Sequence, residues 1–505
     1  MRRTFSRELN FAVTTLDPGG PPVDCIVLGI FASGELSREA AQLDTLCGGR
    51  LQRVVELGDF SGRVDETLLL VDLPKVRASR VLLVGMGTRK GYDRKAWRKS
   101  LATGVAALAR TRVRVAVVAL PRPDVEELDD YEYGRAVAQE SYGGIYRTND
   151  LKTGEKSAAP ALEKILVIGE ASAEDIHRGL LHGGALGRAV RFHRDLGNLP
   201  ANFCTPEYLA EQARGIGKRH SSVKVKVLDE AALRREKMGC MLAVTQGGGE
   251  PARFLVLQYR GTKGAAPIVL VGKGVTFDTG GISLKSPPNM DLMKYDMLGG
   301  GTVLACVTLA AELQLPVNVV GIVATCENMP SERAVKPGDV VTSASGQTVE
   351  ILNTDAEGRL LLCDALHYAR RYKPAAVVDI ATLTGSVIAA LGAQHSGLMS
   401  NDDALARELL ACGVRADDRV WQLPVMDEYA EPLKSEVADV ANFNFGGAED
   451  AVSAAAFLSR FTRGMPWAHL DVAGTAYTVR PKKGVTGRPI PLLADFLIQR
   501  AQRRG

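Results

Sequence analysis

The sequence predicts a two-domain α/β protein, with a smaller N-terminal α/β domain and a larger C-terminal domain whose central mixed sheet is sandwiched by helices. Three observations support this. A chain of 505 residues is too long for one ordinary hydrophobic core. Its composition, 46% hydrophobic and 24% charged with 52 glycines, is typical of a globular α/β enzyme. Apolar runs of strand length also alternate with helical stretches along the chain.

The smaller domain is predicted over residues 1–170. Its strands are expected in five apolar runs, CIVLGIF, TLLLVDL, RVLLVGMG, VRVAVVAL and KILVIG. A helix is predicted from Asp93 to Ala109. The segment GMGTRKG at Gly85 resembles a dinucleotide-binding loop, but its third glycine is out of register and no acidic residue follows at the expected distance. A plain strand-to-helix turn is therefore preferred.

A connecting helix is predicted over residues 171–197, because Ala, Leu, Arg and His recur there with helical spacing until the prolines of NLPANFCTP end it. The larger domain is predicted over residues 198–505. Its strands are expected near Val223, Phe254, Ile268, Val317, Ala376 and Ala468, and its helices near Gly300, Arg359, Asp403, Ala448 and Ile490. The uncharged stretch 380–401 is expected to form a strand and a glycine-rich loop rather than a membrane span.

Charge and cysteine usage limit the function classes. The net charge is +4 and no long Lys/Arg run accompanies it, so DNA binding stays open but unsupported. The eight cysteines form no C-x-x-C pair and several lie in apolar runs, which predicts reduced, mostly buried thiols in a cytoplasmic protein. The N-terminal segment MRRTFSRELNFAVTT has no apolar stretch of signal-peptide length, so export is not expected.

Seven charged side chains gather in two short segments: Lys273, Asp278, Lys285 and Asp296 in the first, and Asp355, Glu357 and Arg359 in the second. The first segment follows the apolar run PIVLV and is rich in glycine, which predicts a loop at the end of a buried strand. The second, NTDAEGRL, lies between a strand-like run at 348–352 and a helical run at 359–371. Both are places where functional sites are built.

Four carboxylates brought together there would repel one another unless positive charge lay between them, and one or two metal ions are the simplest source. Oxygen ligands without a Cys pair favour Mn²⁺, Mg²⁺, Zn²⁺ or Co²⁺. Surface ion pairs are the ordinary alternative. The glycines argue against it, because they let backbone approach a ligand closely. A phosphate loop at Lys273 is disfavoured, since Gly274 follows it where Ser or Thr is required.

Several of these segments resemble signatures of the leucine aminopeptidase family, also called cytosol aminopeptidases: VGKGVTFDTGGISLK, MDLMKYDM, NTDAEGRL, DIATLTG, EYAEPLKSEVAD and GVTGRP. The similarity extends from Asn198 to the end of the chain, NTDAEGRL is highly specific, and the N-terminal part is similar only loosely. Ser286 and Cys363 depart from the family pattern, where proline and alanine are common. The resemblance implies a C-terminal catalytic domain and a metal-dependent aminopeptidase that removes N-terminal residues, leucine preferred, from peptides inside the cell.

By motif, the resemblance implies a centre of two divalent ions, Mn²⁺ or Zn²⁺. It implies that one ion is held by Lys273, Asp278, Asp296 and Glu357, and the other by Asp278, Asp355 and Glu357. A lysine ligand must be neutral, so the adjacent dication would have to lower the pKa of Lys273 by several units.

The implied mechanism places a water between the two ions, where it loses its proton and attacks the scissile carbonyl, while one ion binds the free α-amine of the substrate. The ammonium of Lys285 would stabilise the oxyanion. Arg359 has no proton to give up, and the resemblance implies that it holds a bicarbonate ion that carries the proton. The pocket for the first side chain is assigned to Met293, Thr382, Leu383 and Gly385.

Other polar residues receive ordinary interpretations. His367, His395 and His469 lie in helical or apolar surroundings and are interpreted as core or surface residues. Asp471 in HLDVAG is interpreted as a cap of the following turn. The resemblance also implies a homohexamer whose active sites face an internal cavity. Two other function classes stay open, a DNA-binding regulatory protein and an inactive relative, and the seven chemically competent positions disfavour the second.

Overall fold

The chain folds into two compact units, Met1–Arg191 and Phe192–Gly505. The computed structural model describes residues 8–17, 22–126, 128–148, 151–154, 159–169, 173–447, 450–480 and 483–503. The division between the units falls inside helix α5 (Glu174–Gly197). The predicted domain boundary at residues 170 and 171 lies outside the described residues. Each unit combines a sheet with helices, which confirms the predicted two-domain α/β fold class.

The smaller unit contains a six-stranded sheet in the order β1-β6-β5-β2-β4-β3. Its strands are β1 (Asn10–Thr14), β2 (Cys25–Ile30), β3 (Thr67–Val71), β4 (Arg80–Gly85), β5 (Val115–Ala119) and β6 (Lys164–Ile168). All neighbouring strands are parallel except β3 and β4. The five predicted strands correspond to β2 to β6. The short run NFAVT forms β1, which the sequence did not predict.

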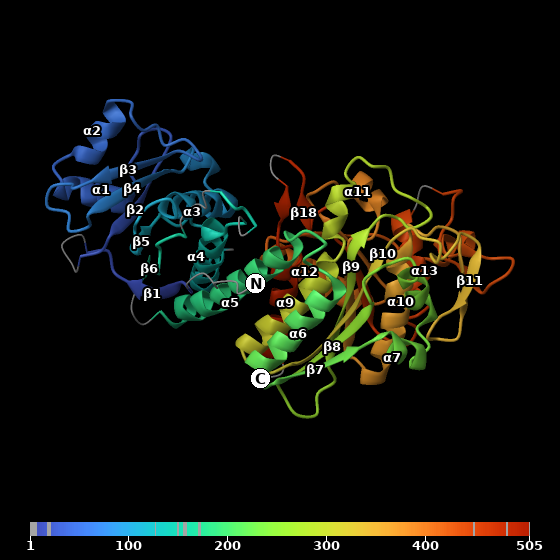
Figure 1. Cartoon of the computed structure of the whole chain (residues 1–505). Helices are drawn as coiled ribbons and strands as arrows, with labels where there is room; N and C mark the ends of the chain where they lie inside the picture. Colours follow the sequence, from blue (N-terminus) through green and yellow to red (C-terminus); the bar gives the residue numbers. More distant parts are fainter. Residues whose placement is uncertain are drawn as a thin grey trace. The chain divides into compact units, whose positions relative to one another are not determined.

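Both faces of this sheet are covered by helices, which explains why its inner strands β2, β4 and β5 are buried along almost their whole length. Val27 of β2 packs with α3 (Arg94–Leu108) and α4 (Asp130–Ile145), whereas its neighbour Leu28 packs with α1 (Arg38–Leu46) and α2 (Arg50–Glu56). Figure 1 shows these elements in blue and teal. GMGTRKG forms a turn with the short 3₁₀ helix η1 (Arg89–Gly91) before α3, so the preference for a plain turn is consistent with the structure.

The larger unit is built on an eight-stranded sheet in the order β15-β14-β17-β13-β9-β10-β8-β7. Its strands are β7 (Val223–Leu228), β8 (Arg253–Arg260), β9 (Ile268–Asp278), β10 (Asn318–Asn328), β13 (Ala376–Ala381), β14 (Ser396–Ser400), β15 (Val420–Gln422) and β17 (Trp467–Asp471). β17, β13, β9 and β10 run parallel, while β8 and β14 are antiparallel to their inner neighbours. The sheet is therefore mixed, as predicted.

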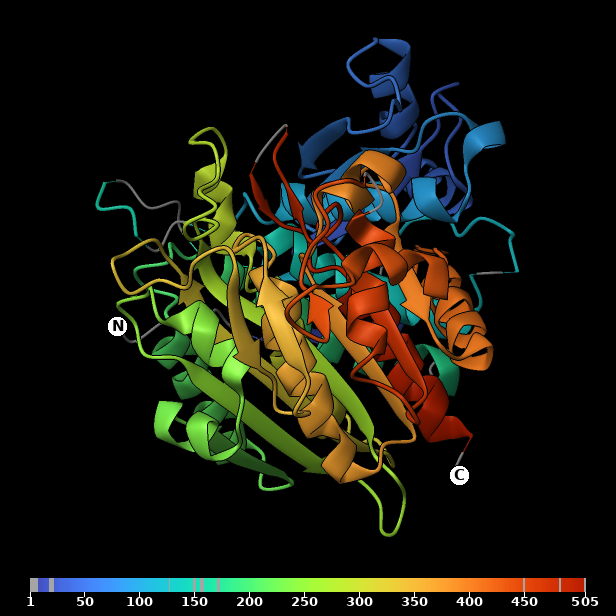
Figure 2. The ribbon, with the colours of Figure 1, turned by 90° about the vertical axis from the view of Figure 1, so that its right-hand side faces the viewer.

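Helices lie on both faces of this sheet (Figure 1). One face carries α6 (Pro206–Arg219), α9 (Leu298–Glu312), α12 (Asp403–Arg415) and α14 (Ile490–Gln502). The other, which faces the viewer in Figure 2, carries α7 (Glu230–Arg235), α8 (Gly239–Thr245), α10 (Glu357–Ala369) and α13 (Asp450–Ser459). Smaller elements complete the unit: β11 (Asp339–Thr342), β12 (Thr348–Ile351), β16 (Val440–Ala441), α11 (Gly385–Leu391), β18 (Tyr477–Thr478) and β19 (Gly484–Val485).

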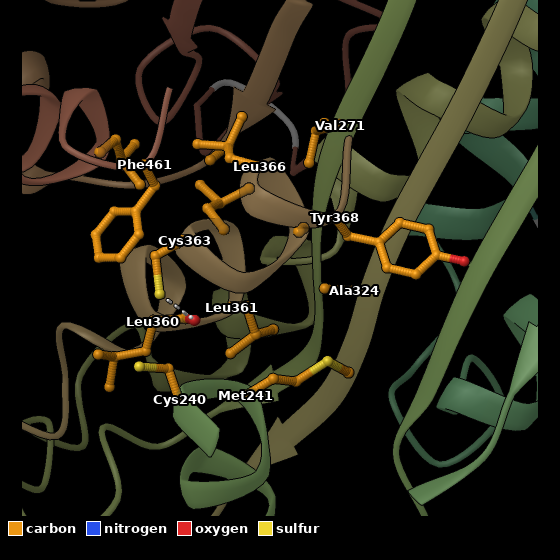
Figure 3. Packing of buried hydrophobic residues seen from close by; sticks show 14 of the residues in the cluster. Cys240, Met241, Val271, Ala324, Leu360, Leu361, Cys363, Leu366, Tyr368 and Phe461 are labelled. Carbon is orange, nitrogen blue, oxygen red and sulfur yellow. Dashed lines mark hydrogen bonds between the residues drawn. The ribbon is translucent and has the colours of Figure 1, made fainter. Parts of the chain in front are cut away.

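The hydrophobic core beneath α10 holds that helix against the sheet. Leu361 and Leu366 of α10 belong to one buried cluster with Val271 of β9 and Ala324 of β10, which Figure 3 shows from close by. Burying leucine side chains of this size contributes roughly 2 kcal/mol each. The first residue of α10, Glu357, is thereby held close to the strands.

Two further expectations have an outcome here. The stretch 380–401 holds the end of β13 and all of β14, as expected, but also the short helix α11, which was not predicted. All eight cysteines are buried and free, as predicted. Among the described residues, no helix combines the length and the apolar character that crossing a bilayer requires.

Candidate active site

Strand β9 supplies Lys273 and Asp278 from the centre of the larger sheet. The prediction that they occupy a loop is wrong, because β9 continues to Asp278 and Lys273 pairs with Ala324 of β10. Glycine makes the close packing of this strand feasible: a Cβ on Gly272 would lie 2.5 Å from the backbone oxygen of Gly299 in α9. The helix can therefore approach the strand beside Lys273.

Three connections supply the other charged groups. Lys285 lies in the loop after β9, and Asp296 follows the 3₁₀ helix η2 (Met290–Tyr295). Asp355 lies between β12 and α10, and Glu357 opens α10. These positions lie far apart in the sequence, and the contacts below show that they meet in space.

Lys273 joins two buried carboxylates. Its Nζ lies 2.7 Å from Asp296 Oδ2 and 2.8 Å from Glu357 Oε1. Burial opposes the charge on Lys273, but the carboxylates of Asp296 and Glu357 outweigh burial and raise the pKa of the amine above its ordinary value. The amine is therefore a charged counterion in this arrangement, whereas a metal-binding lysine has to be neutral.

Lys285 joins a second pair of carboxylates, those of Asp278 and Asp355. Its Nζ lies 2.9 Å from Asp278 Oδ2 and also pairs with Asp355 Oδ1. Oxygen atoms of Asp278, Asp355 and Glu357 all lie within 4.8 Å of one another. We call these three residues, with Lys273, Lys285 and Asp296, the carboxylate cluster.

The electrostatics of the carboxylate cluster favour a cation. Burial and, next, the charge of Asp278 raise the pKa of Asp355 and of Glu357 to about 7. Burial raises the pKa of Asp296 as well. Glu357 Oε2 is buried and accepts no hydrogen bond from any described residue. Since such an oxygen is costly without a partner, the donor set fits a hard or borderline divalent ion.

The sequence did not indicate the residues that orient Asp278. Asn328, at the end of β10, donates from Nδ2 to Asp278 Oδ1 at 2.8 Å and to the Thr354 carbonyl at 3.0 Å. The Gly280 N–H donates to the same Asp278 oxygen at 2.9 Å. Gly280 has φ +86°, and a Cβ there would lie 2.8 Å from Asp355 Oδ1. The only hint in the sequence was Asn328 itself, a polar residue at the end of the apolar run VATCEN, where a strand is expected to end.

Thr382 and Leu383 reach the carboxylate cluster from the end of β13. The Thr382 carbonyl accepts from Lys273 Nζ at 3.0 Å, and the Thr382 hydroxyl donates to Asp296 Oδ1 at 2.7 Å. A Cβ on Gly358 would lie 2.7 Å from Lys273 Cε and 2.8 Å from Leu383 Cδ1. The start of α10, β9 and the segment after β13 therefore meet at Gly358.

The other two residues assigned to the substrate pocket are more open. Met293 is half-buried in η2. Gly385 is exposed at the start of α11, and a Cβ there would have no neighbour within 4 Å. Binding of the substrate by Met293, Thr382, Leu383 and Gly385 stays a prediction.

Arg359 is engaged elsewhere. Its Nη1 donates to the Asn442 carbonyl at 2.9 Å, and its Nη2 donates to Asp450 Oδ1 at 2.6 Å. The guanidinium lies 5.6 Å from the ring centre of Phe443. Its Nε is buried and has no hydrogen-bond partner among the described residues. The Nε N–H of Arg359 is thus available to a ligand, and its ion pair in the described part of the chain is with Asp450.

The histidines do not join the carboxylate cluster. His469 is buried and pairs through Nδ1 with Asp379 Oδ1 at 2.5 Å, and His395 lies edge-on to Trp421. Over the described ranges, no histidine belongs to a group of potential metal ligands.

The interpretation of Asp471 as a simple cap is incomplete. It does accept from the Ala473 N–H at 3.2 Å, as a cap of the following turn would. It also accepts from the Leu383 N–H at 3.1 Å and from the Thr384 hydroxyl at 2.6 Å. The sequence could not show these two contacts, because they join segments about ninety residues apart.

A second group of potential ligands, the cysteine cluster, consists of Cys240, Cys363 and Asp364. It is fully buried, and burial raises the pKa of Asp364 to about 7. Both Asp364 oxygens already accept backbone hydrogen bonds, from Met241 N–H at 2.9 Å and Ala344 N–H at 2.7 Å. Its geometry is that of a structural carboxylate.

A cavity of about 820 Å³ opens beside α7, the loop after α8 and the start of β8. None of the predicted site residues lines it. This cavity is therefore separate from the predicted site residues.

The cytosol aminopeptidase family matches this chain in two parts. Its catalytic domain matches residues 191–494 and its N-terminal domain matches residues 27–155. A probable cytosol aminopeptidase from Nitrosococcus oceani is 46% identical over 499 residues, 98% of this chain and 99% of the relative. One from Paraburkholderia phytofirmans is 50% identical over 481 residues, 95% of this chain and 94% of the relative.

Solved structures agree with these relatives. A tomato leucine aminopeptidase mutant has a TM-score of 0.87 at 30% identity, covering 99% of this chain and 98% of that one. The bottromycin maturation enzyme BotP in complex with Mn has a TM-score of 0.82 at 31% identity, covering 95% of this chain and all of that one. The chain therefore belongs to the cytosol aminopeptidase family and is a metal-dependent aminopeptidase, a hydrolase that acts on peptides.

Proposed function

We propose that the carboxylate cluster is the active site, and that it removes N-terminal residues from peptides with a preference for leucine. The observation that supports this most is the meeting of Asp278, Asp355 and Glu357 oxygens within 4.8 Å, with Asp278 and Glu357 both buried. The buried Glu357 Oε2, which accepts no hydrogen bond from the described residues, adds to it. Such a donor set is suited to divalent ions rather than to ion pairs alone.

Two divalent ions, Mn²⁺ or Zn²⁺, are part of the proposal. One would be held by Lys273, Asp278, Asp296 and Glu357, and the other by Asp278, Asp355 and Glu357. When bound, the ions would supply the Lewis-acid chemistry that activates water and polarises the scissile carbonyl. Lys273 would have to give up its proton to become a ligand, and the Thr382 carbonyl is placed to receive its remaining N–H.

Lys285 is proposed as the donor to the developing oxyanion. Its ammonium pairs with Asp278 and Asp355, and these carboxylates outweigh burial and raise the pKa of the amine. It therefore stays charged across the neutral range, which strengthens its hydrogen bond to a developing oxyanion. Losing one such donor typically costs about 3 to 4 kcal/mol of transition-state stabilisation.

Arg359 is proposed to hold a bicarbonate ion that carries a proton during the reaction. Its buried Nε has no hydrogen-bond partner among the described residues, while Nη1 and Nη2 donate to Asn442 and Asp450. A guanidinium keeps its proton, so any proton transfer belongs to the bound anion. Comparing turnover in carbon-dioxide-free buffer with turnover after added bicarbonate tests this role, which equal rates would contradict.

The preference for leucine is attributed to a pocket formed by Met293, Thr382, Leu383 and Gly385. An apolar side chain at Leu383, beside the start of α10, suits an aliphatic first residue. The open space at Gly385 leaves room for that side chain. Measured kcat/KM for leucine, alanine and glutamate substrates tests the preference.

The proposal includes peptide turnover in the cytoplasm by a homohexamer. Eight buried free thiols support a reducing compartment, and the similar relatives are named cytosol aminopeptidases. Light scattering of the purified protein measures the assembly directly. A mass of about 54.0 kDa would contradict a hexamer.

One assay tests the central activity. The purified protein is expected to hydrolyse leucine-p-nitroanilide, to lose activity with a chelator, and to recover it with Mn²⁺ or Zn²⁺. Asp355→Asn and Lys285→Ala are expected to lose most of the turnover, whereas Asp439→Asn, an exposed residue that pairs with Thr348, is the matched control. Unchanged turnover in both site variants would defeat the assigned roles.

A further inference from the structure

Asp471 is a buried carboxylate with a rigid backbone. It ends β17, which has β13 on one side and β14 on the other. Ala381 and Gly397 lie opposite it on those two strands. Because strands on both sides pair with β17, the backbone of Asp471 moves little, and the groups that its side chain binds are held in place.

Three donors converge on this carboxylate, and two of them belong to the segment after β13. Oδ2 accepts from the Thr384 hydroxyl at 2.6 Å, and Oδ1 accepts from the Leu383 N–H at 3.1 Å. The third donor, the Ala473 N–H, is the longest at 3.2 Å. Both oxygens of a carboxylate only accept, so all three donors are satisfied at once. Capping of the following turn explains only the weakest contact.

One peptide group links Asp471 to Lys273. The Leu383 N–H and the Thr382 carbonyl belong to the same peptide unit, which is planar and trans, so the two groups point in opposite directions. The N–H donates to Asp471 and the carbonyl accepts from Lys273 Nζ at 3.0 Å. Because the peptide unit is planar, the hydrogen bond that fixes the Leu383 N–H also fixes the direction of the Thr382 carbonyl.

Thr384 restrains the same segment from its other side. Its hydroxyl gives its proton to Asp471 and accepts from the Val387 N–H at 3.2 Å, as the N-cap of α11. The direction of this hydroxyl is thereby set by both partners. The segment from Thr382 to Thr384 is therefore held at two successive residues by one carboxylate.

We propose that Asp471 is a positioning residue of the aminopeptidase reaction, which holds the Thr382–Leu383 peptide so that Thr382 meets Lys273 and Asp296. Thr382 then offers its carbonyl to the amine and its hydroxyl to Asp296 Oδ1. Without Asp471 the peptide can rotate, and both contacts are lost together. The kinetic consequence rests on the proposed function, whereas the structural consequence does not.

The test compares Asp471→Ala and Asp471→Asn with the control Asp364→Ala. Asp364 is equally buried and accepts two backbone N–H groups, but these come from Met241 and Ala344 in the cysteine cluster region. Four quantities are measured on the full chain: hydrogen exchange of the Leu383 amide, Mn²⁺ affinity by calorimetry, kcat and KM for leucine-p-nitroanilide, and Tm.

Asp471→Ala is expected to lose protection of the Leu383 amide, to bind Mn²⁺ about tenfold more weakly, and to lose about 100-fold in kcat/KM. Asp471→Asn keeps an oxygen for the Leu383 and Ala473 N–H groups and is expected to recover most of each loss. Asp364→Ala is expected to lower Tm while keeping Leu383 protection and Mn²⁺ affinity.

A fall in Tm for Asp471→Ala, with Leu383 protection and Mn²⁺ affinity unchanged, would reduce Asp471 to a structural cap. If Asp471→Ala does not fold, Thr384→Val removes only the hydroxyl contact, and unchanged protection and affinity there would overturn the proposal. If the wild-type chain does not cleave leucine substrates but the variant loses protection and Mn²⁺ affinity, positioning stands and the proposed function fails.

Discussion

The carboxylate cluster and the cysteine cluster look alike as lists of potential ligands, yet they differ in how their oxygens are used. In each, three ligand atoms lie within 4.8 Å of one another. Both draw on α10, which carries Glu357 in its first turn and Asp364 about two turns later. The Asp364 oxygens accept backbone N–H groups, whereas Glu357 Oε2 accepts no hydrogen bond from the described residues.

This difference indicates that a cation site needs buried carboxylate oxygens without hydrogen-bond donors, and that ligand atoms lying close together are not enough. A buried carboxylate whose two oxygens both accept backbone N–H groups has fewer lone pairs left for a ligand, and it stabilises the loops that it binds. A buried carboxylate without such donors needs a counterion. In the carboxylate cluster, Lys273 and Lys285 meet part of that need.

The largest expected difference between the two clusters is catalytic. Glu357→Gln removes a charge from the centre of the carboxylate cluster and is expected to lower kcat/KM by about a thousandfold. Asp364→Asn makes the same chemical change on the same helix and is expected to stay within about threefold of wild type. Steady-state kinetics measure kcat/KM of both variants. Similar losses of kcat/KM would show that the two clusters do not differ in their contribution to catalysis.

Lys273→Arg tests whether the amine in the carboxylate cluster must become neutral. A guanidinium cannot release its proton, so we expect Mn²⁺ affinity to fall by about 10- to 100-fold and turnover to fall with it. Calorimetric titration measures the affinity. Lys434→Arg, at an exposed pair with Glu431, is the control and should change neither quantity.

Gly358→Ala tests the close packing between α10 and the carboxylate cluster. The new Cβ would lie 2.7 Å from Lys273 Cε and 2.8 Å from Leu383 Cδ1, so both side chains must move. We expect a loss of about 1 to 3 kcal/mol in unfolding free energy and at least about tenfold in kcat/KM.

Gly215→Ala in α6 is the matched control for this substitution. Its nearest contact would be the flexible Arg219 side chain at 3.4 Å, so we expect a neutral effect or a gain of about 0.5 kcal/mol. Denaturant unfolding measures both variants, and equal stability changes would refute the steric argument.

The last expected difference between the clusters is a pH dependence of stability in the cysteine cluster. Burial raises the pKa of Asp364 to about 7, so the folded chain holds this proton between about pH 4 and about pH 7 while the unfolded chain releases it. The contribution of Asp364 to stability is therefore present at low pH and lost as the pH rises to about 7.

Asp364→Asn cannot titrate. Between about pH 5 and about pH 7.5, wild type is expected to lose more unfolding free energy than this variant, by on the order of 2 kcal/mol. Denaturant titrations at both pH values measure the difference. A parallel pH dependence of the two proteins would show that Asp364 is ionised in the folded chain throughout.

The local pattern of the sequence predicted elements that depend on neighbours in the chain. The apolar run before Lys273 predicted β9, and NTDAEGRL between a strand and a helix predicted the turn that carries Asp355 and Glu357. The local pattern gave a wrong prediction for Lys273 itself, which was expected in a loop but lies in β9. Glycines beside it look like a loop in sequence, but in space Gly272 lets α9 approach the strand.

Contacts between distant segments were beyond the sequence. Asn328 orients Asp278 across fifty residues, and Asp471 binds Leu383 across 88 residues. The partner of Arg359, Asp450, is 91 residues away. No periodicity records such pairs, because they depend on the order of strands in the sheet rather than on any one strand.

Crystals of the protein soaked with Mn²⁺, measured for anomalous scattering, test the central claim most directly. The account predicts two peaks, each within about 2.3 Å of carboxylate oxygens from Asp278 and Glu357, and none beside Cys240 and Cys363. A peak at the cysteine cluster with none at the carboxylate cluster would contradict it. The ion would then have bound beside Asp364, whose oxygens accept backbone N–H groups, in preference to Glu357, whose Oε2 accepts no hydrogen bond from the described residues.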